Sequence, residues 1–340
     1  MKAARREPVE QTPVWLMRQA GRYLPEYRQL RRTTSFLDLC KNPDLCAEVM
    51  IRTVEQIGVD AAIIFSDLLL ILEPMGLQLE YTAGGGPVLH NPIRNAAAVD
   101  ALGELDSVEP LEFVMETVRK TRSGLPESLP LIGFAGAPFT LAAYAIEGGA
   151  SRDYRLSKTL MHSDAGAWNA LMVRLARAVA LYLNAQIDAG AQLVQLFDSW
   201  AGCLSTDDYR RHVLPHTRAV IESLRPGVPV IHFATGNPAL LPLLSEAFGN
   251  RNDGAIVGVD WRIRLDDAWH AVGHERAIQG NLDPTVLLTN PAEIRRRAEE
   301  ILRQANHRPG HIFNLGHGVL PQTPPENVVA LVEAVHEFRR

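Results

Sequence analysis

The sequence contains little lysine and cysteine, and this scarcity excludes two kinds of chemistry. Only four of its 34 basic residues are lysines, at positions 2, 41, 120 and 158, and none lies at the end of a predicted strand. A lysine that forms an imine with a carbonyl substrate is therefore not expected. The cysteines, Cys40, Cys46 and Cys203, include no CxxC pair and leave an odd thiol. They favour a reducing compartment over a disulfide framework.

Long apolar runs and extended basic surfaces are missing as well. The longest apolar region, residues 61–72, is interrupted by Ser66 and Asp67 and is too short to cross a bilayer. No apolar segment follows the basic first residues, so no secretory signal is expected and the cytoplasm is the predicted location. The net charge of -5 argues against general binding of nucleic acid.

Motifs for metals and phosphates are also sparse. The pairs His212/His216 and His270/His274 have helical spacing, but no HExxH motif or cysteine cluster accompanies them, so no metal is expected. The glycine-rich segment 82–92, "TAGGGPVLHNP", is followed by no helix start. We therefore interpret it as a flexible lid or turn rather than a phosphate loop.

Short β-rich segments alternate with helical periodicity along the whole chain. Eight strands are predicted, at 13–17, 61–66, 130–135, 192–197, 229–234, 255–260, 277–281 and 311–316. Helical patterns lie between or after them, at 42–58, 164–190, 206–224, 238–248, 264–273, 291–305 and 325–338. Eight apolar strands covered by helices can close a parallel sheet, which predicts a single-domain (β/α)8 TIM barrel over residues 1–340, with 1–10 flexible. An open doubly wound sheet is the alternative, but its GxGxxG motif is missing.

Polar side chains gather where these strands end, and in a barrel all such ends open onto the face that carries active sites. The pattern favours an enzyme. The residues concerned are Arg18, Arg22, Asp67, Asp198, Ser199, Asp260, Asn281, Asp283 and His317.

Two arginines and one aspartate give this face a chemical character. Arg18 and Arg22 directly follow an apolar strand, where a solvated helix face should not begin, so a polyanionic ligand is their expected partner. For Arg28 and Arg32, a solvated basic helix face is as good an interpretation as a ligand contact. Asp67 either caps a helix or projects into the barrel mouth, where it would accept several N–H groups or stabilise a cation.

Several segments together resemble the uroporphyrinogen decarboxylase family. They are "PVWLMRQAGRYLPEYR", "AAIIFSD", "PLIGFAGAPFTL", "YAIEGG", "GAQLVQLFDSWAG", "IVGVDW", "QGNLDP" and "NLGHGV", in this order from about residue 11 to the C-terminus. The resemblance implies a homodimeric barrel of haem biosynthesis. Such an enzyme removes carbon dioxide from the four acetates of uroporphyrinogen III to give coproporphyrinogen III, without metal or organic cofactor.

The resemblance also implies roles for particular residues. Asp67 would lie beneath the macrocycle, accept its pyrrole N–H groups and stabilise a cationic intermediate, while Arg18 would hold the reacting acetate. The other implied substrate-binding residues are Gln19, Ala20, Gly21, Arg22, Arg31, Tyr144, Ser199 and His317. From its sequence context alone, Tyr144 could equally be a packed helical aromatic.

Two alternatives remain open on the sequence. A non-catalytic porphyrin-binding barrel would keep the arginines but would have no need of Asp67. Zinc-dependent methyltransferases of the same superfamily carry a His-x-Cys pair where this chain has His232 and Ala234, so the thiolate is missing. Trp200 departs from the family pattern, without an assigned role.

Overall fold

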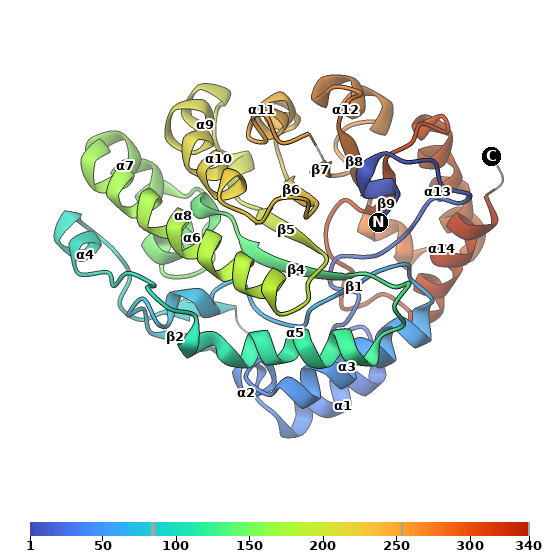
Figure 1. Ribbon diagram of the computed structural model, residues 1–340, viewed down its shortest axis with the longest axis horizontal. Coiled ribbons are helices and arrows are strands. Elements are labelled where there is room, and N and C mark those ends of the chain that lie inside the picture. The colour runs from blue at the N-terminus through green and yellow to red at the C-terminus, as the bar shows by residue number, and fades with distance from the viewer. Residues whose placement is uncertain (83–85, 253, 339–340) are drawn as a thin grey trace.

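A curved parallel sheet of seven strands forms the centre of the computed structural model, which describes residues 1–82, 86–252 and 254–338 (Figure 1). Every neighbouring pair of strands in this sheet is parallel. Seven of the eight predicted strands are thereby confirmed. In their order across the sheet they are β1 (Ala62–Ile63), β4 (Leu131–Gly136), β5 (Leu193–Asp198), β6 (Val230–Ala234), β7 (Ala255–Gly258), β8 (Ala277–Leu282) and β9 (His311–Leu315).

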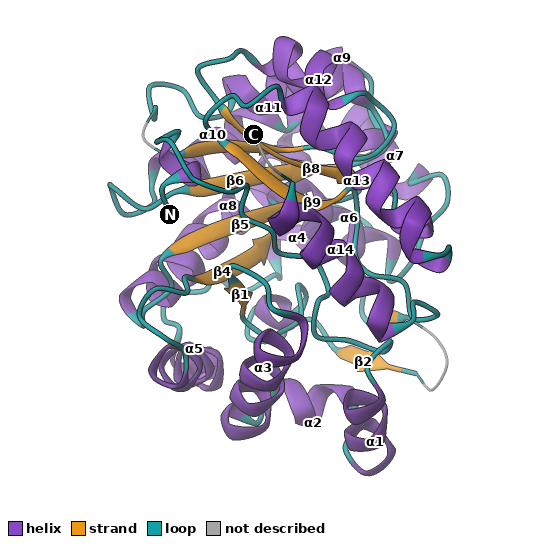
Figure 2. Ribbon diagram, turned by 90° about the vertical axis from the view of Figure 1, so that its right-hand side faces the viewer, coloured by secondary structure: helices purple, strands orange, loops and turns teal. Residues whose placement is uncertain are grey.

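Helices surround the sheet (Figure 2). The α-helices are α1 (Pro25–Thr33), α2 (Phe36–Cys40), α3 (Pro43–Ile57), α4 (Ala96–Asp100), α5 (Glu112–Gly124), α6 (Pro138–Glu147), α7 (Arg155–Ser163), α8 (Ala165–Asp188), α9 (Thr206–His212), α10 (Leu214–Glu222), α11 (Leu241–Glu246), α12 (Leu265–Val272), α13 (Pro291–Ala305) and α14 (Pro325–Glu337). Short 3-10 helices cover η1 (Ala3–Arg5), η2 (Leu70–Leu72), η3 (Glu109–Leu111), η4 (Ala201–Cys203), η5 (Pro238–Leu240) and η6 (Pro284–Leu288).

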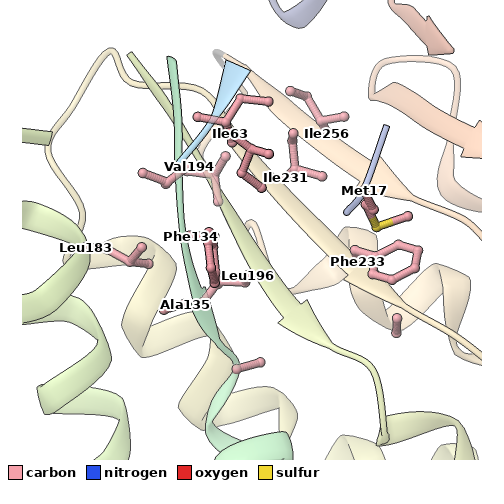
Figure 3. Close-up of a cluster of buried hydrophobic side chains, with 14 of the residues drawn as sticks. Met17, Ile63, Phe134, Ala135, Leu183, Val194, Leu196, Ile231, Phe233 and Ile256 are labelled. Atoms are coloured by element: carbon pink, nitrogen blue, oxygen red, sulfur yellow. The ribbon is translucent and has the colours of Figure 1, made fainter. Parts of the chain in front are cut away.

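The strands are apolar on both sides because both sides are covered. Every residue of β4 and of β8 is buried, as expected for a parallel sheet with helices packed on it. Figure 3 shows part of this core, where Phe134 of β4, Ile231 and Phe233 of β6 and Ile256 of β7 lie near Met17. The buried hydrophobic side chains form one continuous core cluster.

A chain of buried polar groups shows how strongly the sheet curves. Gln279 of β8 donates from Nε2 to Oε1 of Gln195 on β5, at 3.1 Å. Three strand spacings separate β5 from β8, which in a flat sheet would be about 14 Å. Trp15 extends the chain, because its Nε1 donates to Gln279 Oε1 at 3.0 Å. The curvature therefore brings distant strands and residues 13–17 around one interior.

The first predicted strand, residues 13–17, needs correction. It forms an isolated parallel bridge between Val14 and Phe313 of β9 rather than a full strand. On its other side, Val14 O accepts from the Asp60 N–H at 2.8 Å, while the Val14 N–H donates to the Asp60 carboxylate at 2.7 Å. The side-chain carboxylate takes the place of a backbone partner, and the chain turns at Arg18, where φ is +61°.

Most of the predicted helices are confirmed, including 42–58 and 164–190. The predicted helix 206–224 is divided into α9 and α10, because Pro215 lacks the N–H that a continuous helix would need. Helix α8 is long and apolar enough to cross a membrane, with a mean hydropathy of 1.2, but 56% of that window is buried inside the protein. It packs on β4 and on α6 and α10, which is typical of a core helix.

Two peripheral segments frame the sheet. Residues 3–5, within the predicted flexible N-terminus, form η1, and Ala3 and Ala4 are buried. The glycine-rich segment lies in an antiparallel hairpin of β2 (Leu79–Tyr81) and β3 (Pro87–Leu89). The predicted lid or turn at 82–92 falls partly on residues 83–85, which lie outside the described residues.

Candidate active site

The loop that follows the Val14 bridge is held by Gln19. Its Oε1 accepts the Leu16 N–H and its Nε2 donates to Ala61 O, each at 3.0 Å, so the loop is fastened to the start of β1. The Tyr23 hydroxyl donates to Gln19 O at 2.7 Å. The Gln19 side chain is fully buried. The Gln19 carboxamide is therefore not accessible to a ligand, and a direct contact at this loop would have to come from the neighbouring backbone.

Arg18 and Arg22 are presented by this loop without partners. Among the described residues, neither guanidinium makes a hydrogen bond or an ion pair, and the N–H groups of Ala20, Gly21 and Arg22 are also unbonded. Both arginines are accessible to solvent. Protein nevertheless surrounds much of Arg18, and this desolvation, together with the charge of Arg22, lowers the Arg18 pKa. Two exposed cations thus lie on the same loop as several backbone N–H groups that have no partner among the described residues.

Asp67 lies near Arg18, at the end of the segment that contains β1. Its Oδ1 accepts the Leu69 N–H at 2.9 Å, and its carboxylate also accepts from Tyr81 of β2. Burial raises the Asp67 pKa, whereas the Tyr81 hydroxyl, the backbone N–H groups and the charge of Arg18 lower it. Asp67 therefore bonds the turn that precedes η2 without capping that helix, and it interacts with Arg18.

Tyr144 of α6 lies near Asp67 and Arg18. Together with Trp200 and Tyr154 it forms a group of packed rings that we call the aromatic wall. The Tyr144 ring stacks on Trp200, with centroids 3.7 Å apart, and Tyr154 packs on the same indole, with centroids 5.1 Å apart. Desolvation and the nearby charge of Asp67 raise the Tyr144 pKa to about 12, so its hydroxyl is a neutral donor at physiological pH. Trp200, to which the sequence assigned no role, supports this tyrosine.

His317 lies between two glycines for reasons of packing. A side chain at Gly318 would collide with the Arg18 side chain, 2.4 Å from Cδ, and one at Gly316 would lie 2.5 Å from the Trp261 N–H nitrogen. Desolvation and the charge of Arg18 lower the His317 pKa to about 4, so the imidazole is neutral at pH 7. Arg18 and His317 therefore share one side of the site.

Asp198, Asp260 and Asn281 also lie at strand ends, and their side chains make hydrogen bonds within the protein. Asp198 is fully buried and accepts from Thr140 Oγ1 of α6 at 3.0 Å, and burial raises its pKa to about 7. Asp260 accepts the Gly236 N–H at 2.7 Å, and Asn281 donates to Asp260 O at 2.8 Å. These side chains tie neighbouring loops together rather than facing the arginines.

Two further predicted residues are placed less centrally. Ser199 is half-buried after β5, where its carbonyl accepts from Thr235 Oγ1 at 3.2 Å. Arg31 donates to Thr34 O and lies over the Phe36 ring, with its Cζ 5.6 Å from the centroid. Because Arg31 already has these partners, it differs from Arg18 and Arg22.

Tyr81 is the site residue that the strand-end pattern did not reveal. It lies on the peripheral hairpin, and the ring of Phe36 packs on it at 4.7 Å. Burial and the Asp67 carboxylate raise its pKa, so the hydroxyl stays protonated and donates to Asp67. The nearby segment "TAGGGP" marked a turn, but it gave no indication of what the strand before it touches.

Comparison with known proteins shows to which family this chain is similar. The family model described as uroporphyrinogen decarboxylase (URO-D) matches residues 1–338. The uroporphyrinogen decarboxylase of Sorangium cellulosum (strain So ce56) is 51% identical over 341 residues, covering 100% of this chain and 96% of that protein. That of Roseiflexus sp. (strain RS-1) is 51% identical over 344 residues, covering 99% and 97%.

This chain belongs to the uroporphyrinogen decarboxylase family. Membership makes it a carboxy-lyase and confirms the resemblance on which the sequence interpretation depended.

Solved structures with low sequence identity share the fold. A methyltransferase from Methanosarcina mazei superposes with a TM-score of 0.78 at 21% identity, covering 99% of this chain and 96% of that one. A B12-independent methionine synthase from Shewanella sp. W3-18-1 gives 0.56 at 10% identity, covering 86% of each chain. These likenesses concern the arrangement of strands and helices and not the chemistry.

Proposed function

We propose that this protein removes carbon dioxide from the four acetate side chains of uroporphyrinogen III, giving coproporphyrinogen III in porphyrin biosynthesis. The observation that carries the proposal is one site in which Arg18, without a hydrogen bond or ion pair of its own among the described residues, lies close enough to both Arg22 and the Asp67 carboxylate to interact with their charges. The substrate has the complementary chemistry, because it carries eight carboxylates around four pyrrole N–H groups. Membership of the family over nearly the whole chain supports the same reaction.

Arg18 and Arg22 would bind substrate carboxylates. Guanidinium groups bind carboxylates through two parallel hydrogen bonds and keep their charge when they are partly desolvated. The free N–H groups of Ala20, Gly21 and Arg22 would add neutral donors to the same carboxylates. Gln19 would contribute by holding the loop.

Asp67 would accept the pyrrole N–H groups and stabilise the cation that forms on the ring. A carboxylate that is poorly solvated gains more from these donors and from an adjacent positive charge than a solvated one would. The Tyr81 hydroxyl would favour the ionised form of Asp67 before substrate binds, because a hydrogen bond to the charged form favours that form. Tyr144, His317 and Ser199 would contact the substrate around this centre, and Arg31 would support the rim of the site.

The reaction then needs no cofactor. A proton adds to a pyrrole ring carbon, and the C–C bond of an acetate breaks to release carbon dioxide, with its electron pair neutralising the cationic ring. The exocyclic methylene takes up a second proton and becomes a methyl group. The ring carbon then loses the proton that was added to it, which restores the pyrrole, so each cycle consumes one proton in total. Arg18 would hold the acetate that reacts, while the neutral His317 and Tyr144 would orient it.

The finer architecture is also part of the proposal. We infer a single-domain barrel in which residues 13–15 close the sheet between β9 and β1. The bonds of this segment to Phe313 on one side and Asp60 on the other support closure. We further infer a homodimer, as the family resemblance implies, located in the cytoplasm, where the three unpaired thiols would remain reduced.

The alternatives lack supporting geometry. A binding barrel without catalysis would have no use for a desolvated Asp67, which is costly to keep charged. For zinc chemistry on β6, Ala234 offers no ligand, and His232 is fully buried against Leu244 O, with its Nδ1 at 3.3 Å.

An anaerobic assay with uroporphyrinogen III, with chelator present and no added cofactor, tests the proposal. Products are oxidised and separated by carboxylate number. A series of seven, six, five and then four carboxylates supports the reaction and its cofactor independence. Tight binding without turnover would favour the binding barrel, and the absence of both would refute the proposed function.

A further inference from the structure

A cluster of three possible metal ligands lies between α7 and α9, outside the proposed catalytic site. One ligand atom each from His162, Asp208 and His212 lies within 4.8 Å of the other two. The two imidazole rings meet edge to face, with centroids 6.0 Å apart. Helices α7 and α9 are neighbours on the outer rim of the molecule (Figure 1). The sequence paired His212 with His216, but His216 lies on α10 and is only 8% exposed.

We propose that His162, Asp208 and His212 bind a divalent transition-metal ion such as Zn²⁺. Two imidazoles and a carboxylate, with a water molecule in the fourth position, are a common donor set for this ion. Metal–ligand lengths near 2.0–2.2 Å in a tetrahedron separate the ligand atoms by about 3.3–3.6 Å. The present separations, all within 4.8 Å, exceed these values by little more than about 1 Å. This inference is independent of the proposed decarboxylation.

The carboxylate is already oriented. Ser205 donates from Oγ to Asp208 Oδ2 at 2.8 Å, and its Oγ accepts the Asp208 N–H at 3.1 Å. This bond leaves Oδ1 of Asp208 open. A partner that fixes a ligating carboxylate in this way is usual around metal ions, because it reduces the cost of ordering the side chain.

Both imidazoles are free to bind. Within the described ranges, neither the His162 ring nor the His212 ring makes a hydrogen bond or an ion pair. His212 follows Asp208 by four residues, so the two project from one face of α9. The end of that helix is fixed by Trp168, whose Nε1 donates to His212 O at 3.0 Å.

The ion would join two helices that lie beside the aromatic wall of the catalytic site. Helix α7 begins directly after Tyr154, and α9 follows Trp200 by a few residues. Tyr154 contacts Trp200, and Trp200 in turn stacks on Tyr144. Metal binding should therefore stabilise the folded protein at this wall, in proportion to the free metal concentration.

The test uses untagged protein, freed of metal with a chelator and then desalted. Equilibrium dialysis against Zn²⁺ should give one saturable ion per chain, and the melting temperature should rise with Zn²⁺ concentration. Titration with Co²⁺ should give the strong visible absorption of tetrahedral coordination. His162→Ala and His212→Ala should each weaken binding at least tenfold, and Asp208→Asn, which keeps a side chain for Ser205, should weaken it less.

His270→Ala is the matched control. His270 and His274 also have rings 6.0 Å apart, but they belong to no group with a third ligand among the described residues. The variant should bind one Zn²⁺ as the parent does. The proposal is overturned if the parent shows no saturable binding, if His162→Ala and His212→Ala bind normally, or if His270→Ala weakens binding equally. Circular dichroism checks each fold, and Asp208→Asn decides the outcome if a histidine variant is unfolded.

Discussion

Replacing Tyr81 by phenylalanine should shift the pH dependence of decarboxylation. The Tyr81 hydroxyl donates to Asp67, whose pKa burial raises and this bond lowers. Tyr81→Phe removes one hydroxyl and keeps the ring that packs against Phe36 at 4.7 Å. The protonated form of Asp67 is then favoured further. Because the proposed reaction needs ionised Asp67, activity should be lost at a higher pH than in the parent protein.

The magnitude follows from the energy of one hydrogen bond to a charged acceptor. Such a bond is worth about 1.5–3 kcal/mol, and about 1.4 kcal/mol corresponds to one pH unit. The acidic limb of kcat/KM should therefore move upward by about one to two units. Well above that limb, Asp67 is ionised in both proteins, and the variant should approach the parent activity.

The assay measures initial rates of anaerobic decarboxylation across pH, with carboxylates counted after oxidation. Tyr154→Phe is the control. Tyr154 is another tyrosine near the site, where it packs on Trp200, but it does not bond Asp67. Its acidic limb should coincide with that of the parent. If Tyr81→Phe leaves the limb in place, or lowers activity equally at every pH, Tyr81 does not control the ionisation of Asp67.

Three further changes test other parts of the structure. Asp67→Asn should abolish decarboxylation, and normal turnover would remove Asp67 from the mechanism. The same variant should raise the melting temperature at pH 7, because a carboxyl whose folded-state pKa is raised destabilises the fold once it ionises. Arg22→Ala should raise KM roughly tenfold or more with little change in kcat. Arg32 is exposed, and Arg32→Ala should leave KM unchanged as the control. An unchanged KM in Arg22→Ala would contradict the proposed contact between Arg22 and a substrate carboxylate. His336 pairs with Asp60 at 2.8 Å, which raises the His336 pKa, so this stabilisation is full below about pH 6.5 and is lost as pH rises through the raised value. His336→Gln should flatten that part of the stability curve by about 1 kcal/mol or less, because both side chains are partly exposed; an identical curve would show that the pair contributes nothing.

The sequence predicted the strands well because each is a short apolar segment bounded by turn residues. It failed at residues 13–17, where the Asp60 carboxylate accepts the Val14 N–H in place of a backbone partner. A local pattern contains no information about such a distant partner. The same limit explains Tyr81, which joins the site through the folding of a hairpin onto Asp67.

Strand-end position identified candidates but could not separate a ligand contact from a scaffold contact. Asp67 and Asp198 both follow apolar segments, yet only Asp67 lies beside Arg18, while Asp198 is fully buried against Thr140. Side chains alternate between the two faces of a strand. Whether a residue faces the interior or the helices therefore depends on register, which the sequence places to within only a residue or two.

The free site carries charges that are costly without a ligand. Desolvation and the positive charge of Arg22 lower the Arg18 pKa, and Asp67 is a desolvated carboxyl whose pKa is raised. Moving Arg18 and Asp67 into direct contact would relieve both costs, but the two groups interact at a distance and make no ion pair. A substrate with carboxylates at its edge and N–H groups at its centre relieves both costs at once, because each group meets its complement. The stability lost to these charges in the free protein is thus regained as binding energy when such a substrate enters.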